Sequence, residues 1–315
     1  MVRLIIDTDT AGDDCVSLLV ALRSPDVVVE AITINCGNVA FDQQVENALY
    51  TLEAAGFGDG SGRPRVPVYP GCTQPLLHPH ETIEYIHGRD GMGDSFFPTA
   101  RQRPEPEHAV DALVRLINDN PGELTIIAQA PLTNLAMAVR RDPSIARKVK
   151  QVWLMGGTNN ALGNVTPPAE FNVYVDPEAA KIVFGAGFPL TMVGWEICVR
   201  HGILDAAATA EVEALRTPLA RFFLDINRVV RRFNLTQGIE GTTHPDSIVA
   251  AMVVDPAIMT RSGEYYVDVE TSGELTRGMT VVDELGALNR PANTRVCLAA
   301  DGARFRRLLF DVLRG

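Results

Sequence analysis

Short apolar runs rich in β-branched residues alternate with helical patterns along the chain, and this alternation constrains the fold more than any other feature. Residues 2–6 and 27–34 are typical of buried parallel strands. Between them, residues 15–22 have the apolar spacing of a helix that stops at Ser24 and Pro25. Strand–helix–strand repeats build parallel sheets covered by helices. We therefore predict an α/β fold with an open, mostly parallel sheet and helices on both faces.

The same alternation continues to the end of the chain. Further strand patterns occur at 66–69, 124–128, 152–155, 190–193 and 295–299. Further helical patterns occur at 43–55, 108–118, 132–139, 177–184 and 302–313, and residues 206–254 are largely helical. Residues 264–271 and 276–282 predict a small antiparallel strand pair near the C-terminus. Since no linker interrupts the pattern, we expect a single domain over residues 1–315, with the long irregular stretch 76–103 as a binding loop or lid.

Charge and apolar content exclude several classes of partner. Lys and Arg number 28 against 39 Asp and Glu, which gives a net charge of −11 and argues against nucleic-acid or anionic-membrane binding. The longest apolar stretches, such as 15–22, are shorter than the ~20 residues of a membrane span. The N-terminus has no secretory signal pattern, and the five cysteines have no metal-ligand spacing. A reduced, cytoplasmic protein is expected.

Polar and acidic residues follow each predicted strand, at the sheet edge where parallel α/β proteins bind ligands. They are Asp7, Asp9, Asp13 and Asp14 after the first strand, Asn38 after the second, Gln129 after the fourth, and Asn164, Glu170 and Asn172 after the fifth. Four carboxylates within eight residues need a compensating charge, which a hard cation such as Ca²⁺ or Mg²⁺ supplies. Alternatively, Asp13 and Asp14 only favour the N-terminus of a helix.

One enzyme class that opens with such a strand is the haloacid-dehalogenase-type phosphatase. Its Asp-x-Asp motif, with the first Asp as nucleophile, matches Asp7-Thr8-Asp9. Such enzymes also need a lysine beside the phosphoryl group. The one plausible lysine, Lys181, lies inside a helical pattern, so this alternative has weak support.

A longer series of motifs extends over almost the whole chain. They are IIDTDTAGDD at 5–14, AIT at 31–33 with Gly37 and Asn38, Gly71 with Pro75 and Leu76, HGRDGMG at 87–93, PLTNLA at 131–136, LMGG at 154–157, Asn164, AEFN at 169–172, DPEAA at 176–180, and HPDS at 244–247 before Asp255-Pro256. In this order they resemble the nucleoside hydrolases, the inosine–uridine-preferring ribohydrolase family. The resemblance implies the family's Rossmann-like fold.

The resemblance also implies an activity and a cofactor. It implies hydrolysis of the N-glycosidic bond of ribonucleosides to ribose and free base in nucleoside salvage, with a tightly bound Ca²⁺. The reaction would use a metal-bound water and an oxocarbenium-like transition state. The calcium ligands would be the side chains of Asp9, Asp14 and Asp246 and the backbone carbonyl of Gln129. A homodimer or homotetramer is expected by the same resemblance.

The remaining roles follow from the same match. They are Asp9 as the base that activates water, Asp13 at the ribose 2′-hydroxyl, Asn172 and Asp246 at the 3′-hydroxyl, Asn164 and Glu170 at the 5′-hydroxyl, Asn38 orienting sugar and water, Met155 beneath the ring, His87 lining the base pocket, and His244 as candidate acid for the leaving base. Without the match, several of these have ordinary structural explanations: a turn for Asn38, the core for Met155, and a polar loop for Glu170 and Asn172.

Three differences from the family pattern leave the base preference open. Thr10-Ala11 replaces the common Pro-Gly, and His244 stands one position before the family's histidine. The helix predicted over 222–233 reads Asn227-Arg228-Val229 where relatives can carry tyrosines. A second hypothesis is therefore a ribose- or nucleoside-binding protein of the same fold that does not catalyse hydrolysis.

Overall fold

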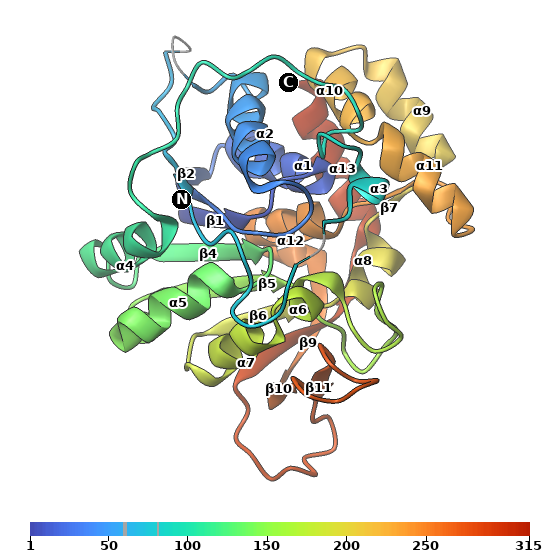
Figure 1. Cartoon of the computed structure of the whole chain (residues 1–315). Helices are drawn as coiled ribbons and strands as arrows, with labels where there is room; N and C mark the ends of the chain where they lie inside the picture. The colour runs from blue at the N-terminus through green and yellow to red at the C-terminus, as the bar shows by residue number, and fades with distance from the viewer. Residues whose placement is uncertain (59–61, 81) are drawn as a thin grey trace.

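The computed structural model describes residues 1–58, 62–80 and 82–315, and its centre is an eight-stranded sheet (Figure 1). The strands in sheet order are β3 (Val68–Pro70), β2 (Val27–Ile34), β1 (Val2–Thr8), β4 (Leu124–Gln129), β5 (Gln151–Met155), β6 (Leu190–Val193), β12 (Thr294–Ala300) and β9 (Met259–Tyr265). Neighbouring strands are parallel except β9, which is antiparallel to β12. The predicted open, mostly parallel sheet is confirmed.

Helices cover both faces of this sheet (Figure 1). One face packs against α1 (Gly12–Arg23), α2 (Phe41–Ala54), α8 (Trp195–His201), α10 (Pro218–Ile226), α12 (Pro245–Val254) and α13 (Gly302–Arg314). The other face packs against α4 (Ala109–Asp119), α5 (Thr133–Arg141) and α7 (Pro177–Gly185). The remaining helices are α3 (Glu84–His87), α6 (Phe171–Val175), α9 (Ala206–Leu215), α11 (Arg228–Thr236) and the 3₁₀ turns η1 (Pro143–Arg147) and η2 (Pro256–Ile258).

Strand β1 shows why both faces need helices. Its side chains point alternately to the two sides of the sheet. Leu4 and Ile6 belong to one buried apolar cluster, and Ile5 belongs to the other. All three are 1% exposed or less, and each contributes roughly 1.5–3 kcal/mol relative to an exposed side chain. A near-continuous apolar strand therefore predicts a sheet buried on both faces.

Several predicted elements differ from the structure by a few residues at their ends, and two of these differences bear on the site. β1 continues two residues beyond residue 6, so Asp7 lies within the strand, paired with Thr33 of β2 and Ala128 of β4. The helix predicted over 222–233 is two helices, α10 and α11, which meet at Asn227. The Asn227 Nδ2 donates to the Phe223 carbonyl at 2.8 Å. That bond closes the end of α10 by a side chain, a contact that apolar spacing does not reveal.

The C-terminal strands also differ in their bounds. β10 (Val267–Val269) and β11 (Thr280–Val282) form the predicted antiparallel pair. Residues 259–265, in contrast, form the edge strand β9, whose side chains are half-buried or exposed. An edge strand of this kind has no apolar run to mark it. A second antiparallel pair, β7 (Ile203–Leu204) with β8 (Thr242–Thr243), interrupts the largely helical region.

Among the described residues, no helix is both long enough and apolar enough to cross a membrane.

Candidate active site

The carboxyl ends of the central strands open into a cavity of about 810 Å³. The predicted site residues that line it are Asp9, Asp13, Asn38, His87, Gln129, Met155, Asn164, Glu170, Asn172 and Asp246. They come from the last residues of β4 and β5, the segments after β1, β2 and β5, the first turns of α1 and α12, and the end of α3. Parallel strands deliver their following loops to one edge, which is why residues distant in sequence meet at this cavity.

Three carboxylates cluster at the cavity floor, where Asp13 and Asp246 line the cavity and Asp14 is fully buried beside them. Oxygen atoms of Asp13, Asp14 and Asp246 all lie within 4.8 Å of one another. Burial raises the pKa of each of them, and for Asp14 and Asp246 the charges of neighbouring aspartates raise it further. Asp9 is not one of the three, but its pKa is also raised, first by burial and then by Asp14 and Asp13. Ionisation of all four carboxylates without a compensating positive charge is unfavourable.

Asp14 is held by more hydrogen bonds than its neighbours. Its Oδ1 accepts from the Thr8 hydroxyl at 2.5 Å and from the Gln129 amide at 3.0 Å. Its Oδ2 accepts from the Ala11 N–H at 2.9 Å and from the Asn38 amide at 3.2 Å. Because four donors converge on a fully buried carboxylate, its position is fixed by β1, β2, β4 and the start of α1 together.

Asp9 lies beneath the turn that follows β2. Its Oδ2 accepts from the Asn38 N–H at 3.1 Å, and its backbone carbonyl accepts from the Asn38 amide at 3.3 Å. A Cβ atom at position 37 would stand 1.7 Å from Asp9 Oδ2, so only Gly37 allows this approach. The Gly37-Asn38 motif is therefore explained by contact with Asp9.

The donor set of the floor fits a hard divalent cation. Every candidate ligand is an oxygen atom, which is the preference of Ca²⁺ and Mg²⁺. The Oδ1 of Asp13 is buried and has no hydrogen-bond partner among the described residues. A buried acceptor of this kind is costly unless an ion or ligand satisfies it. The acidic cluster is thus a possible metal site.

The wall after β5 is organised by Glu170, which caps α6. Its carboxylate accepts from the backbone N–H groups of Asn172 at 2.9 Å, Gly157 at 2.8 Å and Val173 at 3.3 Å. Burial nevertheless raises the pKa of Glu170 to about 7. The Asn172 amide donates to the Met155 carbonyl at 3.2 Å, so strand end and helix start form one rigid wall.

His87 lies at the end of α3, inside the long irregular stretch. Its Nδ1 is 3.7 Å from Asp13 Oδ1, and burial lowers its pKa to about 4. The segment is tied to the site by the Ile83 N–H, which donates to the Asn38 carbonyl at 2.7 Å. His87 therefore faces the cavity beside the carboxylate cluster.

The structure does not bring His244 to the cavity. Its side chain is fully buried, its Nε2 lies 2.7 Å from the Thr242 hydroxyl, and its ring stacks on Phe223 at 5.1 Å. Burial lowers the pKa of His244 to about 3. The neighbours Thr243, Pro245 and Asp246 line the cavity instead. A shift of one position before the start of α12 thus turns the imidazole to the other side of the chain.

The outer half of the cavity contains residues that no sequence motif predicted. It is lined by Tyr85 and Ile86 of α3, Trp195, Glu196, Val199 and Arg200 of α8, Val230, Phe233 and Asn234 of α11, and Gln237 and Ile239 beyond α11. Helices α3 and α11 meet through the Tyr85 and Phe233 rings, whose centroids are 5.8 Å apart. These positions recur at helical spacing, which looks like ordinary core packing in a sequence. Trp195 and Glu196 closely follow β6 (Leu190–Val193), so the strand-end rule could have found these two, whereas helical periodicity was the signal for the others.

Asp7 lies behind this cavity. Its Oδ1 accepts from the Thr33 hydroxyl at 2.6 Å and from the Asn134 amide at 2.8 Å. It is 1% exposed and does not line the cavity. No lysine lines the cavity among the described residues. The two groups that a phosphatase of the haloacid-dehalogenase type requires are therefore not found together in this cavity.

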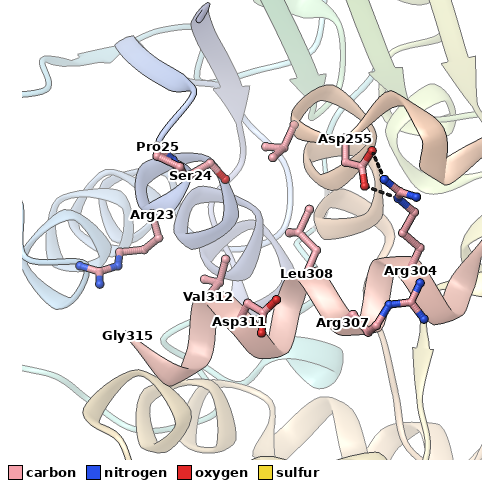
Figure 2. Close-up of a pocket in the computed structure, with 11 residues that line it drawn as sticks. Arg23, Ser24, Pro25, Asp255, Arg304, Arg307, Leu308, Asp311, Val312 and Gly315 are labelled. Atoms are coloured by element: carbon pink, nitrogen blue, oxygen red, sulfur yellow. Dashed lines mark hydrogen bonds and ion pairs between the residues drawn. The ribbon is translucent and has the colours of Figure 1, made fainter.

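A second cavity, of about 490 Å³, lies between the ends of α1, α12 and α13 (Figure 2). It contains the Asp255–Arg304 ion pair and none of the predicted site residues. Helix α1 starts at the carboxylate cluster and ends at Arg23 in this second cavity. Twelve helical residues span about 18 Å, so the two cavities are well separated.

A parallel α/β sheet with a cluster of buried carboxylates at its strand ends defines a protein that binds a small polar ligand, together with a possible metal ion. The chain matches the model of the inosine-uridine preferring nucleoside hydrolase family over residues 4–307. It therefore belongs to this family, which confirms the resemblance drawn from the motifs, and it is an enzyme of the nucleoside hydrolase type.

Individual relatives cover the whole chain. The chain is 36% identical to the inosine-uridine preferring nucleoside hydrolase of Leishmania major, over 99% of this chain and 97% of that protein. It is 32% identical to the pyrimidine-specific ribonucleoside hydrolase RihB of Escherichia coli, with the same coverage. The solved structure of a purine-preferring ribonucleoside hydrolase from Gardnerella vaginalis is similar with a TM-score of 0.91 at 29% identity, covering 99% of this chain and 98% of that one.

Proposed function

We propose that this protein hydrolyses the N-glycosidic bond of ribonucleosides to ribose and free base in a Ca²⁺-dependent reaction. One observation carries the proposal: the cluster of Asp13, Asp14 and Asp246 lies at the floor of a cavity whose walls include Asn172 and Glu170. Carboxylates and amides in this arrangement are acceptors and donors for the hydroxyls of a ribose. The family match over residues 4–307 supports both the activity and a single domain.

Asp9, Asp14, Asp246 and the backbone carbonyl of Gln129 would hold the Ca²⁺. A bound Ca²⁺ would orient the ribose hydroxyls, lower the pKa of a water and balance the charge of the cluster. The four hydrogen bonds on Asp14 support its assignment, because they fix the carboxylate before any ion binds. Asp13 would accept from the 2′-hydroxyl, and Asn172 with Asp246 would contact the 3′-hydroxyl.

Asp9 would accept the proton of the attacking water. Burial and the neighbouring aspartates raise its pKa, which favours a general base that works near neutral pH. As the base departs, positive charge develops on the ribosyl group. The carboxylates of the floor would stabilise that charge, while Asn164 and Glu170 hold the 5′-hydroxyl and Met155 packs beneath the ring.

The first test is release of free base, detected chromatographically, from inosine, uridine, cytidine, adenosine, guanosine and their 2′-deoxy analogues. We expect release from ribonucleosides but not deoxynucleosides, and loss of activity after exhaustive chelation that added Ca²⁺ restores. Binding of nucleosides in a calorimeter without any release would instead support the non-catalytic binding protein.

Substitutions test the assigned carboxylates. We expect Asp9→Ala and Asp246→Ala each to lower kcat by at least about 100-fold, since general-base contributions are of that order. Asp311→Ala is a matched control, because Asp311 lines the distant cavity of Figure 2. Near-normal turnover in either site variant, at unchanged unfolding temperature, would contradict the proposed roles of these two carboxylates.

A further inference from the structure

Departure of a nucleobase creates a negative charge that the site must accommodate. When the C1′–N bond breaks, its electron pair stays on the base nitrogen, so the base leaves as an anion unless a proton is supplied. The ionisable cluster at the floor of the cavity consists of carboxylates, which oppose such an anion. A cation or acid is therefore needed at the opposite, outer half of the cavity.

His244, which stands two positions before the floor residue Asp246, does not supply this cation or acid. His244 is buried behind the cavity against Phe223, and Pro245 occupies the adjacent lining position. His87 does line the cavity, but its imidazole is directed to Asp13 at the ribose end. Neither imidazole therefore faces the outer half.

Arg200 is the one arginine or lysine among the described residues that line the cavity. It lies in the last turn of α8 and is exposed at the cavity rim. Its guanidinium makes no hydrogen bond to any residue in the described part of the chain, so its donors are available to a ligand. A cation at this position is also favoured by the C-terminal end of α8.

One helical turn earlier, Glu196 lies beneath Arg200. Glu196 is 7% exposed and lines the cavity. Its Oε2 accepts from the Asn159 N–H at 3.2 Å, whereas its Oε1 is buried without a hydrogen-bond partner among the described residues. Burial raises the pKa of Glu196, and the charge of Arg200 opposes that rise. Residues four apart face the same side of a helix, and the two side chains form no ion pair, so the attraction between their charges acts over a longer distance.

The surroundings of Arg200 suit a flat heteroaromatic ring. Val199, Ile239 and Phe233 line the same outer half with apolar surface. Asn234 and Gln237 add amide groups from the side of α11. In Figure 1, α8 and α11 lie at the same end of the molecule as α3. Apolar side chains, amides and one guanidinium in this part of the cavity are suited to bind a base that carries ring carbonyls.

We propose that Arg200 binds a carbonyl oxygen of the departing base and stabilises its negative charge, with the buried carboxylate of Glu196 attracting the guanidinium toward the cavity. The inference rests on the proposed function and assigns a residue of this chain to its leaving-group step. The C1′–N electron pair moves onto the base and is shared with the carbonyl oxygen at Arg200. Water forms the new C1′–O bond and gives its proton to Asp9, solvent later protonates the base, and Arg200 keeps its protons.

The test compares two leaving groups in the same variants. Uridine needs stabilisation of its departing base, whereas p-nitrophenyl β-D-ribofuranoside releases a stable anion without help. We expect Arg200→Ala to lower kcat/KM for uridine by about 100-fold, the usual effect of losing one electrostatic donor, and for the nitrophenyl riboside by less than about 3-fold. Arg200→Lys should recover part of the uridine rate, because the charge remains.

Two further variants separate positioning from general damage. Glu196→Gln should lower kcat/KM for uridine less than Arg200→Ala does, and should lower it for uridine more than for the nitrophenyl riboside. Arg232→Ala removes an exposed arginine of α11 that does not line the cavity, and should change neither rate. Equal loss of both substrates in Arg200→Ala, or no loss of either, would overturn the inference. If the wild-type protein with Ca²⁺ cleaves neither substrate, the proposed function itself fails.

Discussion

Glu170 shows how burial and hydrogen bonding oppose each other at one carboxyl group. Three backbone N–H groups stabilise its ionised form, yet burial still raises its pKa to about 7. A carboxyl whose pKa is higher in the folded than in the unfolded protein binds its proton more tightly when folded. Its contribution to stability is therefore full below about pH 4.5 and is lost as the pH rises through 7.

Glu170→Gln removes this titration and predicts a pH-dependent difference. The free energy of unfolding of the wild type, relative to the variant, should fall by on the order of 3 kcal/mol between pH 4.5 and pH 8. Denaturant unfolding at several pH values measures it. Glu213→Gln, on the exposed side of α9, is the control and should show no such trend. If the free energy of unfolding of Glu170→Gln and of the wild type changed with pH in the same way, the raised pKa of Glu170 would be contradicted.

At the scale of helices and strands, His244 connects α10, β8 and α12. Its ring packs on Phe223 of α10, its Nε2 meets Thr242 of β8, and its own position precedes α12. The imidazole thus acts as packing between these elements. Since α12 also carries Asp246, the placement of a candidate metal ligand depends on this buried contact.

His244→Ala is expected to destabilise the protein by about 2–4 kcal/mol, because it leaves a cavity in a fully buried position. The ratio of the uridine and nitrophenyl riboside rates should stay close to that of the wild type. Thermal unfolding and the two assays measure both effects. A selective loss of uridine hydrolysis would instead return His244 to the role of leaving-group acid.

The elements themselves followed from the sequence because their signals are local. Apolar β-branched runs marked β2 and β6 to the residue, and the Asp-rich run after β1 marked the edge where ligands bind. Three features depend on tertiary contacts that no local pattern carries. These are the burial of Asp7 within β1, the break at Asn227, and the direction of the His244 side chain. The outer half of the cavity was missed because its residues alternate with core positions on α8 and α11.

At the scale of the whole molecule, cation binding should stabilise the fold. The floor carboxylates come from segments after β1 and from α12, which lie far apart in the sequence. The unfolded chain therefore holds no such site, and Ca²⁺ should bind the native state alone. At 100 times its dissociation constant, Ca²⁺ is expected to add about 2.7 kcal/mol to the free energy of unfolding.

Thermal unfolding with Ca²⁺ and after chelation measures this effect. Asp246→Asn should abolish the shift, whereas Asp311→Asn, in the distant cavity, should preserve it. An unfolding temperature that is independent of Ca²⁺ in the wild-type protein would argue against a cation at the floor.

Two groups of structural elements build the cavity. Its floor is made by the ends of the sheet strands, the segments that follow them and the first turns of α1 and α12, whereas its outer half is made by α3, α8 and α11. Under the proposed function, substitutions in those three helices would change the contacts of the base and leave the carboxylates of the floor in place. The relatives named above for inosine and uridine, for pyrimidines and for purines each match this chain over 97% or more of their own length. A change of base preference among relatives would then need substitutions only in the outer half of the cavity.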